Sequence, residues 1–295
     1  MKSQILVPLD GSPLAEQVLP CAMMLGQGLP AELVFFHAVS VSPSARGKSA
    51  AAEQVEAQAS EYLQGVVDEM HKAGLSTRYV VQHGPAAESI VDYAEQADVH
   101  QIVMSTHGYT GILRWTHGSV AERVLQASSV PVLMVQTRKE PPGDLHKPMQ
   151  CQHILVPLDG SQTAEQVLPS AALVARAVGA QICLFQVPIV QPATSFGGEW
   201  FFLPTTGEFD EDERQALAYL EGVAEGLRDK GLQVSTATQI GPVAESIIEY
   251  AEANQVDLIA MCTHGRTGLA RWAMGSVADR VLHAGSLPIL LVRAR

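Results

Sequence analysis

The sequence predicts an α/β protein of two tandem domains, each an open five-stranded parallel sheet with helices on both faces. The length of 295 residues suits two medium domains better than one. A long stretch also occurs twice, since "ILVPLDGS" and "AEQVLP" stand near both residue 4 and residue 153, and 83–135 align without gaps with 240–292. Apolar runs alternate with helical stretches in each copy, which is typical of βαβ units with right-handed crossovers.

The repeats are far longer than solenoid units, so they indicate whole duplicated domains. We place the first domain at 1–137 and the second at 152–295. Between them, 138–151 ("RKEPPGDLHKPMQC") contains the proline, glycine and charged residues expected of an exposed linker.

Each copy is expected to begin with a short apolar strand, "QILVPLD" in the first. Ser12 or Ser161 would then cap one helix, expected over 13–27 and 162–179. The remaining elements follow in the same order in both copies: a second strand rich in Val, Ile and Phe, a long helix, a third strand, a helix opened by Gly-Pro, a fourth strand, and a final helix and strand. Their expected positions are 31–39 and 180–190, about 50–73 and 209–230, 76–82 and 233–239, 84–96 and 241–253, 100–106 and 257–263, 119–135 and 276–292.

Composition restricts the class of function. Apolar residues make up 47% of the chain, charged residues 17%, and the net charge is −12 without a cluster of Lys and Arg, which disfavours direct nucleic-acid binding. Neither a signal-peptide core nor an apolar run of about 18 residues occurs, so we expect no membrane association. The cysteines show neither a C-x-x-C pair nor disulfide-like spacing and fit the cytoplasm: Cys21, Cys151, Cys183 and Cys262.

The most unusual residues follow the first and fourth strands. Ligands of open parallel sheets bind beyond the carboxyl ends of the strands, where Asp10 and Asp159, then Thr-His-Gly, then Gly-Ser at 118–119 and 275–276 are expected. A helix N-terminus offers unpaired N–H groups and partial positive charge, and glycine allows close approach, so this pattern favours phosphate. The serine hydroxyl would contact a phosphate oxygen or a hydrated metal ion.

Each residue also has a structural interpretation. Gly-Ser before a helix is an ordinary N-cap, and an aspartate before glycine is an ordinary turn residue. His107 and His264 would stabilise a turn by hydrogen bonding. The arginine–tryptophan pairs at 114–115 and 271–272 would form a surface stack or a buried anchor.

The combination resembles the universal stress protein family in its tandem form, whose fold is related to the adenine-nucleotide alpha-hydrolases. Its nucleotide-binding members carry Gly, two residues, Gly, nine residues, then Gly-Ser or Gly-Thr. Gly108 with Gly118-Ser119, and Gly265 with Gly275-Ser276, match the last two parts. Ser105 and Cys262 stand where the signature begins with glycine, and both are small enough for close backbone approach.

The resemblance implies ATP as ligand, with Mg²⁺ or Mn²⁺ and no protein side chains assigned to the metal. The residues that it places around adenine and ribose are Pro8, Asp10, Ala38, Met104 and Ser105 in copy one, and Pro157, Asp159, Val187, Met261 and Cys262 in copy two. Those that it places around the phosphates are Gly108, Gly118, Ser119 and Val120, and Gly265, Gly275, Ser276 and Val277. Arg266 is a further nucleotide-binding candidate of copy two.

Family members usually pair through their fifth strands, so we expect 131–135 and 288–292 to meet within the chain as a pseudo-dimer, which would cover two apolar sheet edges. A homodimer and a regulatory protein partner are further expectations. The loop at 188–209 contains Phe196, Trp200, Phe201 and Phe202. It would form a lid or a partner surface, or else a separate hydrophobic cluster.

The function expected from the resemblance is a soluble ATP-binding stress-response or signalling protein that acts through nucleotide-dependent conformation or partner binding. Any ATP hydrolysis would be slow. The alternative is a dimeric scaffold of the same fold without nucleotide. A phosphate- or adenylate-transferring enzyme is disfavoured, because neither a Walker lysine motif nor an S-G-G-x-D-S motif occurs.

Overall fold

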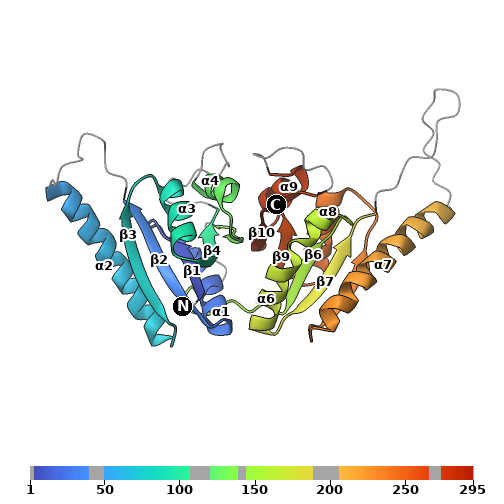
Figure 1. Cartoon of the computed structure of the whole chain (residues 1–295), viewed down its shortest axis with the longest axis horizontal. Helices are drawn as coiled ribbons and strands as arrows, with labels where there is room; N and C mark the ends of the chain where they lie inside the picture. Colours follow the sequence, from blue (N-terminus) through green and yellow to red (C-terminus); the bar gives the residue numbers. More distant parts are fainter. Residues whose placement is uncertain are drawn as a thin grey trace, which may run out of the picture. The chain divides into compact units, whose positions relative to one another are not determined.

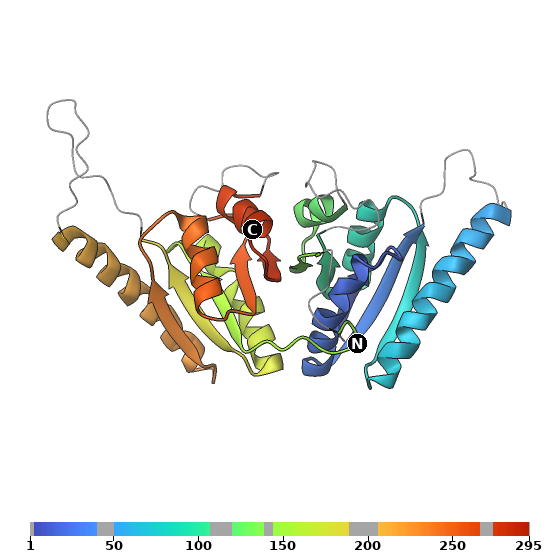
Figure 2. The same ribbon diagram turned by 180° about the vertical axis from the view of Figure 1, so that it is seen from behind.

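A computed structural model describes residues 3–39, 50–106, 120–138, 144–188, 206–265 and 274–294. The chain forms two compact units (Figures 1 and 2). The first comprises Met1–Cys151 and Ser286–Arg293, and the second comprises Gln152–Gly285 and Ala294–Arg295.

The first unit contains a sheet in the order β3-β2-β1-β4-β5-β10. Its first five strands run parallel, and β10 pairs antiparallel with β5, with Ile289 opposite Met134 and Leu291 opposite Val132. The strands are β1 Ser3–Pro8, β2 Ala31–Val39, β3 Thr77–His83, β4 Val99–Ser105, β5 Val132–Val135 and β10 Ile289–Val292.

Helices cover both faces of this sheet. Helices α1 and α2 lie on one face, and α3 and α4 pack against each other on the other (Figures 1 and 2). The helices are the short 3₁₀ helix η1 Ala15–Val18, α1 Leu19–Gly28, α2 Ala50–Lys72, α3 Ala86–Gln96 and α4 Val120–Ala127.

The second unit repeats this arrangement with four parallel strands in the order β9-β6-β7-β8. Its strands are β6 His153–Pro157, β7 Gln181–Gln186, β8 Val234–Thr238 and β9 Leu258–Cys262. Its helices are α5 Gln162–Glu165, α6 Leu168–Val178, α7 Thr206–Arg228, α8 Val243–Ala253 and α9 Ser276–Ala284. The parallel α/β class expected from the sequence is therefore present in both repeats.

The helix after the first strand differs from the prediction. The sequence suggested one continuous helix, but a short helical turn precedes the main helix in each unit, as η1 before α1 and as α5 before α6. Pro20 and Pro169 lie in the first turn of the main helices. Proline has no N–H to donate and is tolerated only at the start of a helix, so the longer helix is interrupted there.

The core of each unit consists of the central strands and the helix faces packed on them. Leu6 and Val7 of β1, and Leu155 and Val156 of β6, have no exposed surface. Such continuous apolar strands are typical of parallel sheets covered on both faces. The same packing holds the carboxyl ends of the strands in fixed positions.

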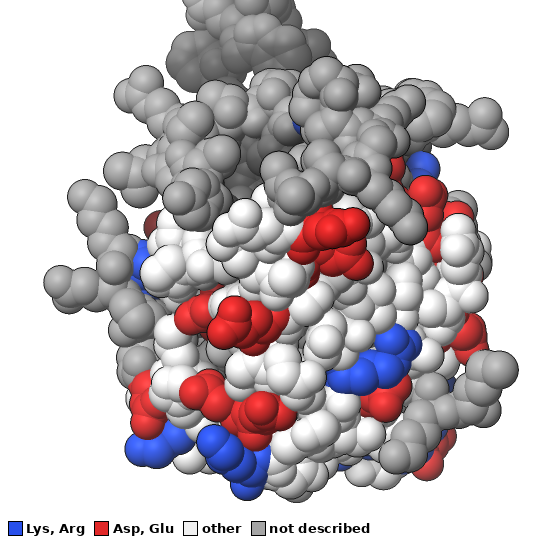
Figure 3. Space-filling view, turned by 90° about the vertical axis from the view of Figure 1, so that its left-hand side faces the viewer, with Lys and Arg blue, Asp and Glu red and all other residues white. Residues whose placement is uncertain are grey.

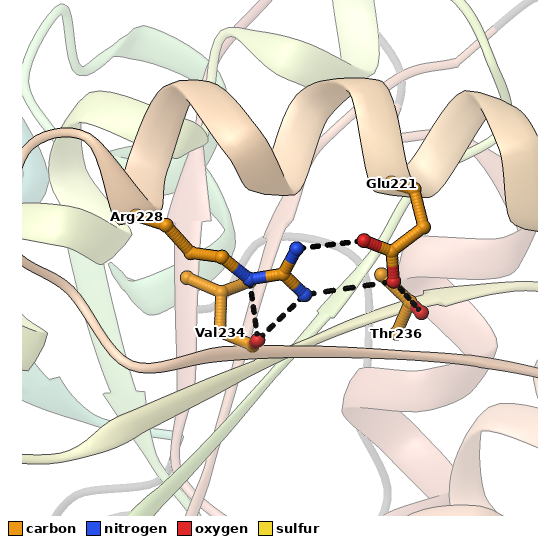
Figure 4. Close-up of polar contacts among 4 residues, drawn as sticks. All are labelled: Glu221, Arg228, Val234 and Thr236. Atoms are coloured by element: carbon orange, nitrogen blue, oxygen red, sulfur yellow. Dashed lines mark hydrogen bonds and ion pairs between the residues drawn. The ribbon is translucent and has the colours of Figure 1, made fainter.

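An exposed polar network attaches α7 to β8 (Figure 4). The Arg228 guanidinium donates to the Val234 carbonyl at 2.9 and 3.1 Å and to Glu221 Oε2 at 2.7 Å. Thr236 Oγ1 donates to Glu221 Oε1 at 2.7 Å. Hydrogen bonds from Arg228 and Thr236 lower the pKa of the Glu221 carboxyl below its ordinary value.

The surface carries mixed charge. On the described part of the face in Figure 3, the basic side chains form small separate patches beside acidic ones, without a continuous basic stripe. Within the described segments, no helix is both long and apolar enough to cross a membrane.

Candidate functional site

The second unit contains a cavity of about 230 Å³ beyond the carboxyl ends of its strands. Its walls come from the ends of β6, β7 and β9 and from the first turns of α8 and α9. The lining residues are Pro157, Leu158, Asp159, Ala164, Phe185, Gln186, Val187, Val243, Ile247, Met261, Cys262, Thr263, His264, Gly265, Gly275, Ser276, Val277 and Ala278. This is the edge at which open parallel sheets bind ligands.

Asp159 is held in place by the serine that follows it. Its Oδ1 accepts hydrogen bonds from Ser161 N at 3.0 Å and from Ser161 Oγ at 2.6 Å. Ser161 Oγ in turn accepts from Ala164 N at 3.1 Å and caps α5. The Asp-Gly-Ser sequence therefore fixes the orientation of the Asp159 carboxylate. Ser161 caps the helix that follows, as predicted.

Gly265 lies directly against the Asp159 carboxylate. A Cβ atom built on Gly265 would collide with Asp159 Oδ2. The sequence suggested that glycine was needed here for close approach of an anion. The structure gives an additional reason for glycine at this position. The backbone of Gly265 lies so close to the Asp159 carboxylate that no space remains for a side chain.

Gly275 joins the loop after β9 to the start of α9. Gly275 N donates to the Thr263 carbonyl at 2.8 Å, and a Cβ on Gly275 would lie 2.9 Å from the same oxygen. Gly275 is the N-cap of α9, so no side chain caps this helix. Ser276 is the first helical residue and is exposed. The Gly-Ser pair therefore supplies the N-cap of α9 through Gly275, as its structural interpretation expected, while Ser276 lies inside the helix.

The start of α9 faces the cavity through Ser276, Val277 and Ala278. The first N–H groups of an α-helix have no acceptor within the helix and carry partial positive charge. This side of the cavity therefore suits an anion such as phosphate.

Apart from Asp159, the rest of the cavity wall is mainly apolar. Phe185, Ile247 and Met261 are buried in its walls. Burial raises the pKa of the Cys262 thiol to about 12, and the nearby Asp159 charge acts in the same direction. The thiol is thus protonated at neutral pH and contributes a small, neutral surface.

Two polar atoms of lining residues are buried without a hydrogen-bond partner: Gln186 Oε1 and His264 Nε2. The other ring nitrogen of His264, Nδ1, lies 3.1 Å from Thr263 Oγ1. Buried polar groups are nearly always paired. Both atoms have almost no exposed surface, so they lie within the cavity wall rather than on its surface.

The described segments contain no group of three or more His, Cys, Asp and Glu side chains arranged to hold an ion. Among the lining residues, Asp159 is the one carboxylate, and Lys and Arg are absent from the described lining.

The structure brings together every described residue that the resemblance assigned to copy two. Pro157, Asp159, Val187, Met261, Cys262, Gly265, Gly275, Ser276 and Val277 all line the cavity. In copy one, Pro8, Asp10, Ala38, Met104, Ser105 and Val120 lie at the equivalent ends of β1, β2 and β4 and at the start of α4. Gly108, Gly118, Ser119, Arg266, His107, both arginine–tryptophan pairs and 189–205 of the aromatic loop lie outside the described residues.

Three further lining residues were not predicted from the sequence: Gln186, Val243 and Ile247. Val243 and Ile247 lie four residues apart, so they share one face of α8 at the cavity. That spacing was visible in the sequence, but it is equally typical of any buried helix face. Gln186 was detectable as a polar residue within an apolar strand.

Comparison with known proteins agrees with this architecture. The model of the universal stress protein family matches residues 1–136 and again 150–293. The chain is 31% identical over 140 residues to universal stress protein MJ0531 of Methanocaldococcus jannaschii, covering 48% of this chain and 81% of that protein. It is 24% identical over 239 residues to a universal stress protein of Mycolicibacterium smegmatis, covering 81% of this chain and 75% of that protein.

A solved structure has the same fold over nearly the whole chain. The universal stress protein from Archaeoglobus fulgidus superimposes with a TM-score of 0.69 at 21% identity, covering 99% of this chain and 96% of that one. The duplicated sequence, the two parallel α/β units and the two family matches lead to one conclusion: the chain belongs to the universal stress protein family and carries two of its domains in tandem.

Proposed function

We propose that this protein is an ATP-binding stress-response protein whose conformation or partner affinity depends on the bound nucleotide. The observation that supports this most directly is the cavity of the second unit, which places an apolar pocket next to the N-terminus of α9. A purine base would occupy the apolar part, and the phosphates would accept hydrogen bonds from the first N–H groups of the helix.

Ser276 is the side chain best placed to assist the phosphates. It is exposed at the first position of α9 and lines the cavity. Its hydroxyl would bind a phosphate oxygen or a water of a Mg²⁺ or Mn²⁺ ion that arrives with ATP. The metal would then be held mainly by the phosphates, as is common for Mg²⁺.

Hydrolysis of ATP is expected to be slow. Rapid phosphoryl transfer requires cationic groups on the transferred phosphate and a residue that orients the attacking water. The described lining contains neither Lys nor Arg. Asp159 Oδ1 already accepts two hydrogen bonds from Ser161.

We place the protein in the cytoplasm and expect a regulatory protein partner. The antiparallel pairing of β5 with β10 supports association of the two repeats within one chain as a pseudo-dimer. A further homodimer is compatible with this proposal.

The second candidate is a scaffold of the same fold without nucleotide. It is favoured by Ser105 and Cys262, which stand where the binding signature begins with glycine. Cys262 lines the cavity with a buried thiol, so its side chain takes space that a glycine would leave free.

Isothermal titration calorimetry of the nucleotide-free full chain with ATP and Mg²⁺ tests the two candidates. We expect binding, and about a 10- to 150-fold loss of affinity in Ser276→Ala, equivalent to about 1.5–3 kcal/mol for one hydrogen bond to a charged group. Ser235→Ala, at an exposed position of β8 outside the cavity lining, is the control and should bind like the wild type. Absence of binding at millimolar ATP would favour the scaffold.

A further inference from the structure

The same tyrosine–glutamate hydrogen bond occurs in both repeats. Tyr62 of α2 donates to Glu16 Oε1 at 3.0 Å, and Tyr219 of α7 donates to Glu165 Oε1 at 2.9 Å. All four residues are half-buried. Most other positions of the two long helices differ between the repeats, whereas this tyrosine is present in both. The bond attaches the long helix of each unit to the helical turn that follows the first strand.

In the second unit, this turn holds the carboxylate of the cavity. Glu165 is the last residue of α5, and its N–H donates to the Ser161 carbonyl at 3.3 Å. Ser161 caps the same helix and donates through Oγ to Asp159 Oδ1 at 2.6 Å. Both Asp159 and Ala164 line the cavity. A continuous series of contacts therefore runs from α7 to the cavity wall.

The first unit contains the same series of contacts. Glu16 N donates to the Ser12 carbonyl at 3.2 Å, and Ser12 Oγ donates to Asp10 Oδ1 at 2.6 Å. Burial and the charge of Glu16 raise the pKa of Tyr62 above its ordinary value. The Tyr62 phenol is therefore protonated at neutral pH and remains a hydrogen-bond donor.

We propose that Tyr219, and Tyr62 in the first repeat, are positioning residues that couple the ligand site to the long helix. This rests on the proposed nucleotide binding and concerns the regulation of that site. The tyrosine restrains the turn that holds the aspartate, so the carboxylate keeps one orientation. Coupling between two parts of a protein is reciprocal. A nucleotide held against this turn therefore also stabilises the packing of α7, and loss of the hydrogen bond weakens nucleotide binding.

The first test is calorimetry of the full chain with ATP and Mg²⁺. Tyr219→Phe keeps the ring and removes the hydroxyl, so we expect about a 2- to 30-fold loss of affinity at the second site, the range found for residues that act on a site through other residues. Tyr250→Phe is the matched control. Tyr250 is also half-buried in the second unit, but its hydroxyl contacts Cys183 Sγ at 3.4 Å, outside the described cavity lining. This control should bind ATP like the wild type.

Substitutions of the acceptor separate positioning from general packing. Glu165→Gln keeps a side-chain oxygen that accepts from Tyr219, so its ATP affinity should stay within twofold of the wild type. Glu165→Ala removes the acceptor and should weaken binding as much as Tyr219→Phe does. Because both changes break one hydrogen bond, the double variant should bind no more weakly than either single variant.

Hydrogen exchange, measured with and without ATP, gives a readout that a merely structural bond would not change. In the wild type, we expect ATP to slow amide exchange both in the turn at 162–166 and in α7. In Tyr219→Phe, ATP should slow exchange in the turn alone. Without nucleotide, this variant should exchange faster at Ala164 N, which donates to Ser161 Oγ in the turn.

Three results would overturn the inference while leaving the proposed function intact. The first is an ATP affinity of Tyr219→Phe equal to that of the wild type. The second is an equal slowing of α7 exchange by ATP in both proteins, and the third is a double variant whose losses add. If the wild type binds no ATP, the proposed function fails and the coupling to nucleotide fails with it. Tyr62→Phe, measured in the same way, reports on the first repeat.

Discussion

The two repeats agree closely at the end of the first strand and differ at the ends of the second and fourth. Asp10 Oδ1 accepts from Ser12 N at 3.0 Å and from Ser12 Oγ at 2.6 Å, the same distances as in the Asp159–Ser161 pair. By contrast, His37 corresponds to Gln186, and Ser105 corresponds to Cys262. The shared residues fix the turn after the first strand, whereas Gln186 and Cys262, the variable residues of the second repeat, line its cavity.

The long helices α2 and α7 also share one contact and differ in the residue that makes it. Near the end of α2, His71 Nε2 donates to the Thr77 carbonyl at 3.1 Å, and Arg228 of α7 donates to the Val234 carbonyl at the same place in the repeat. The backbone acceptor is retained while the donor changes. In the second unit, Glu221 and Thr236 extend the contact into a network.

The largest expected effect concerns the contact between Gly265 and Asp159. In Gly265→Ala, the new Cβ would collide with Asp159 Oδ2, so either the carboxylate or the loop after β9 must move. We expect a loss of about 1–3 kcal/mol in the free energy of unfolding from overpacking, and at least a tenfold loss of ATP affinity at the second site. Urea denaturation and calorimetry measure the two effects.

Gly222→Ala is the matched control for that substitution. Gly222 lies within α7, and an added Cβ meets nothing within 4 Å. Replacing a helical glycine by alanine should stabilise the unit by about 0.5–1 kcal/mol. If both variants behaved alike, the close approach of Gly265 to Asp159 would have no energetic importance.

The second-largest effect concerns the serine that follows the first strand in each repeat, and it tests whether this serine stabilises both repeats. Ser12→Ala and Ser161→Ala each remove a hydroxyl that bonds the aspartate and accepts from the backbone N–H three residues later. We expect each to lower the free energy of unfolding by about 1–2 kcal/mol, with the larger loss at Ser12, which is 4% exposed. Urea denaturation of the two variants and of Ser235→Ala gives the comparison, and a loss in one repeat alone would contradict their equivalence.

Much of this fold could be predicted because the repeat reveals its own boundaries and the apolar runs have the lengths of strands. The ends of the first and fourth strands were also predictable, since Asp-Gly-Ser and Gly-Ser have few structural interpretations. The breaks at Pro20 and Pro169 were missed because proline is compatible with a helix start as well as a helix end. Gln186 was missed because an unpaired oxygen depends on what surrounds it, which local sequence does not show.

The smallest effect is expected from a substitution that gives the second repeat the residue of the first. Glu221 corresponds to Gln64 of α2, so Glu221→Gln leaves Arg228 bound to the Val234 carbonyl but removes its charged partner. The pKa of Glu221 is lowered in the folded protein by Arg228 and Thr236. Its stabilising effect is therefore present above the ordinary glutamate pKa of about 4.3 and is lost as the pH falls through the lowered value. Because the group is exposed, the variant should melt only slightly below the wild type at pH 7, and the two melting curves should converge as the pH falls below about 4. A difference in melting temperature that grew at low pH would mean that the carboxylate destabilises α7 rather than anchoring it to β8.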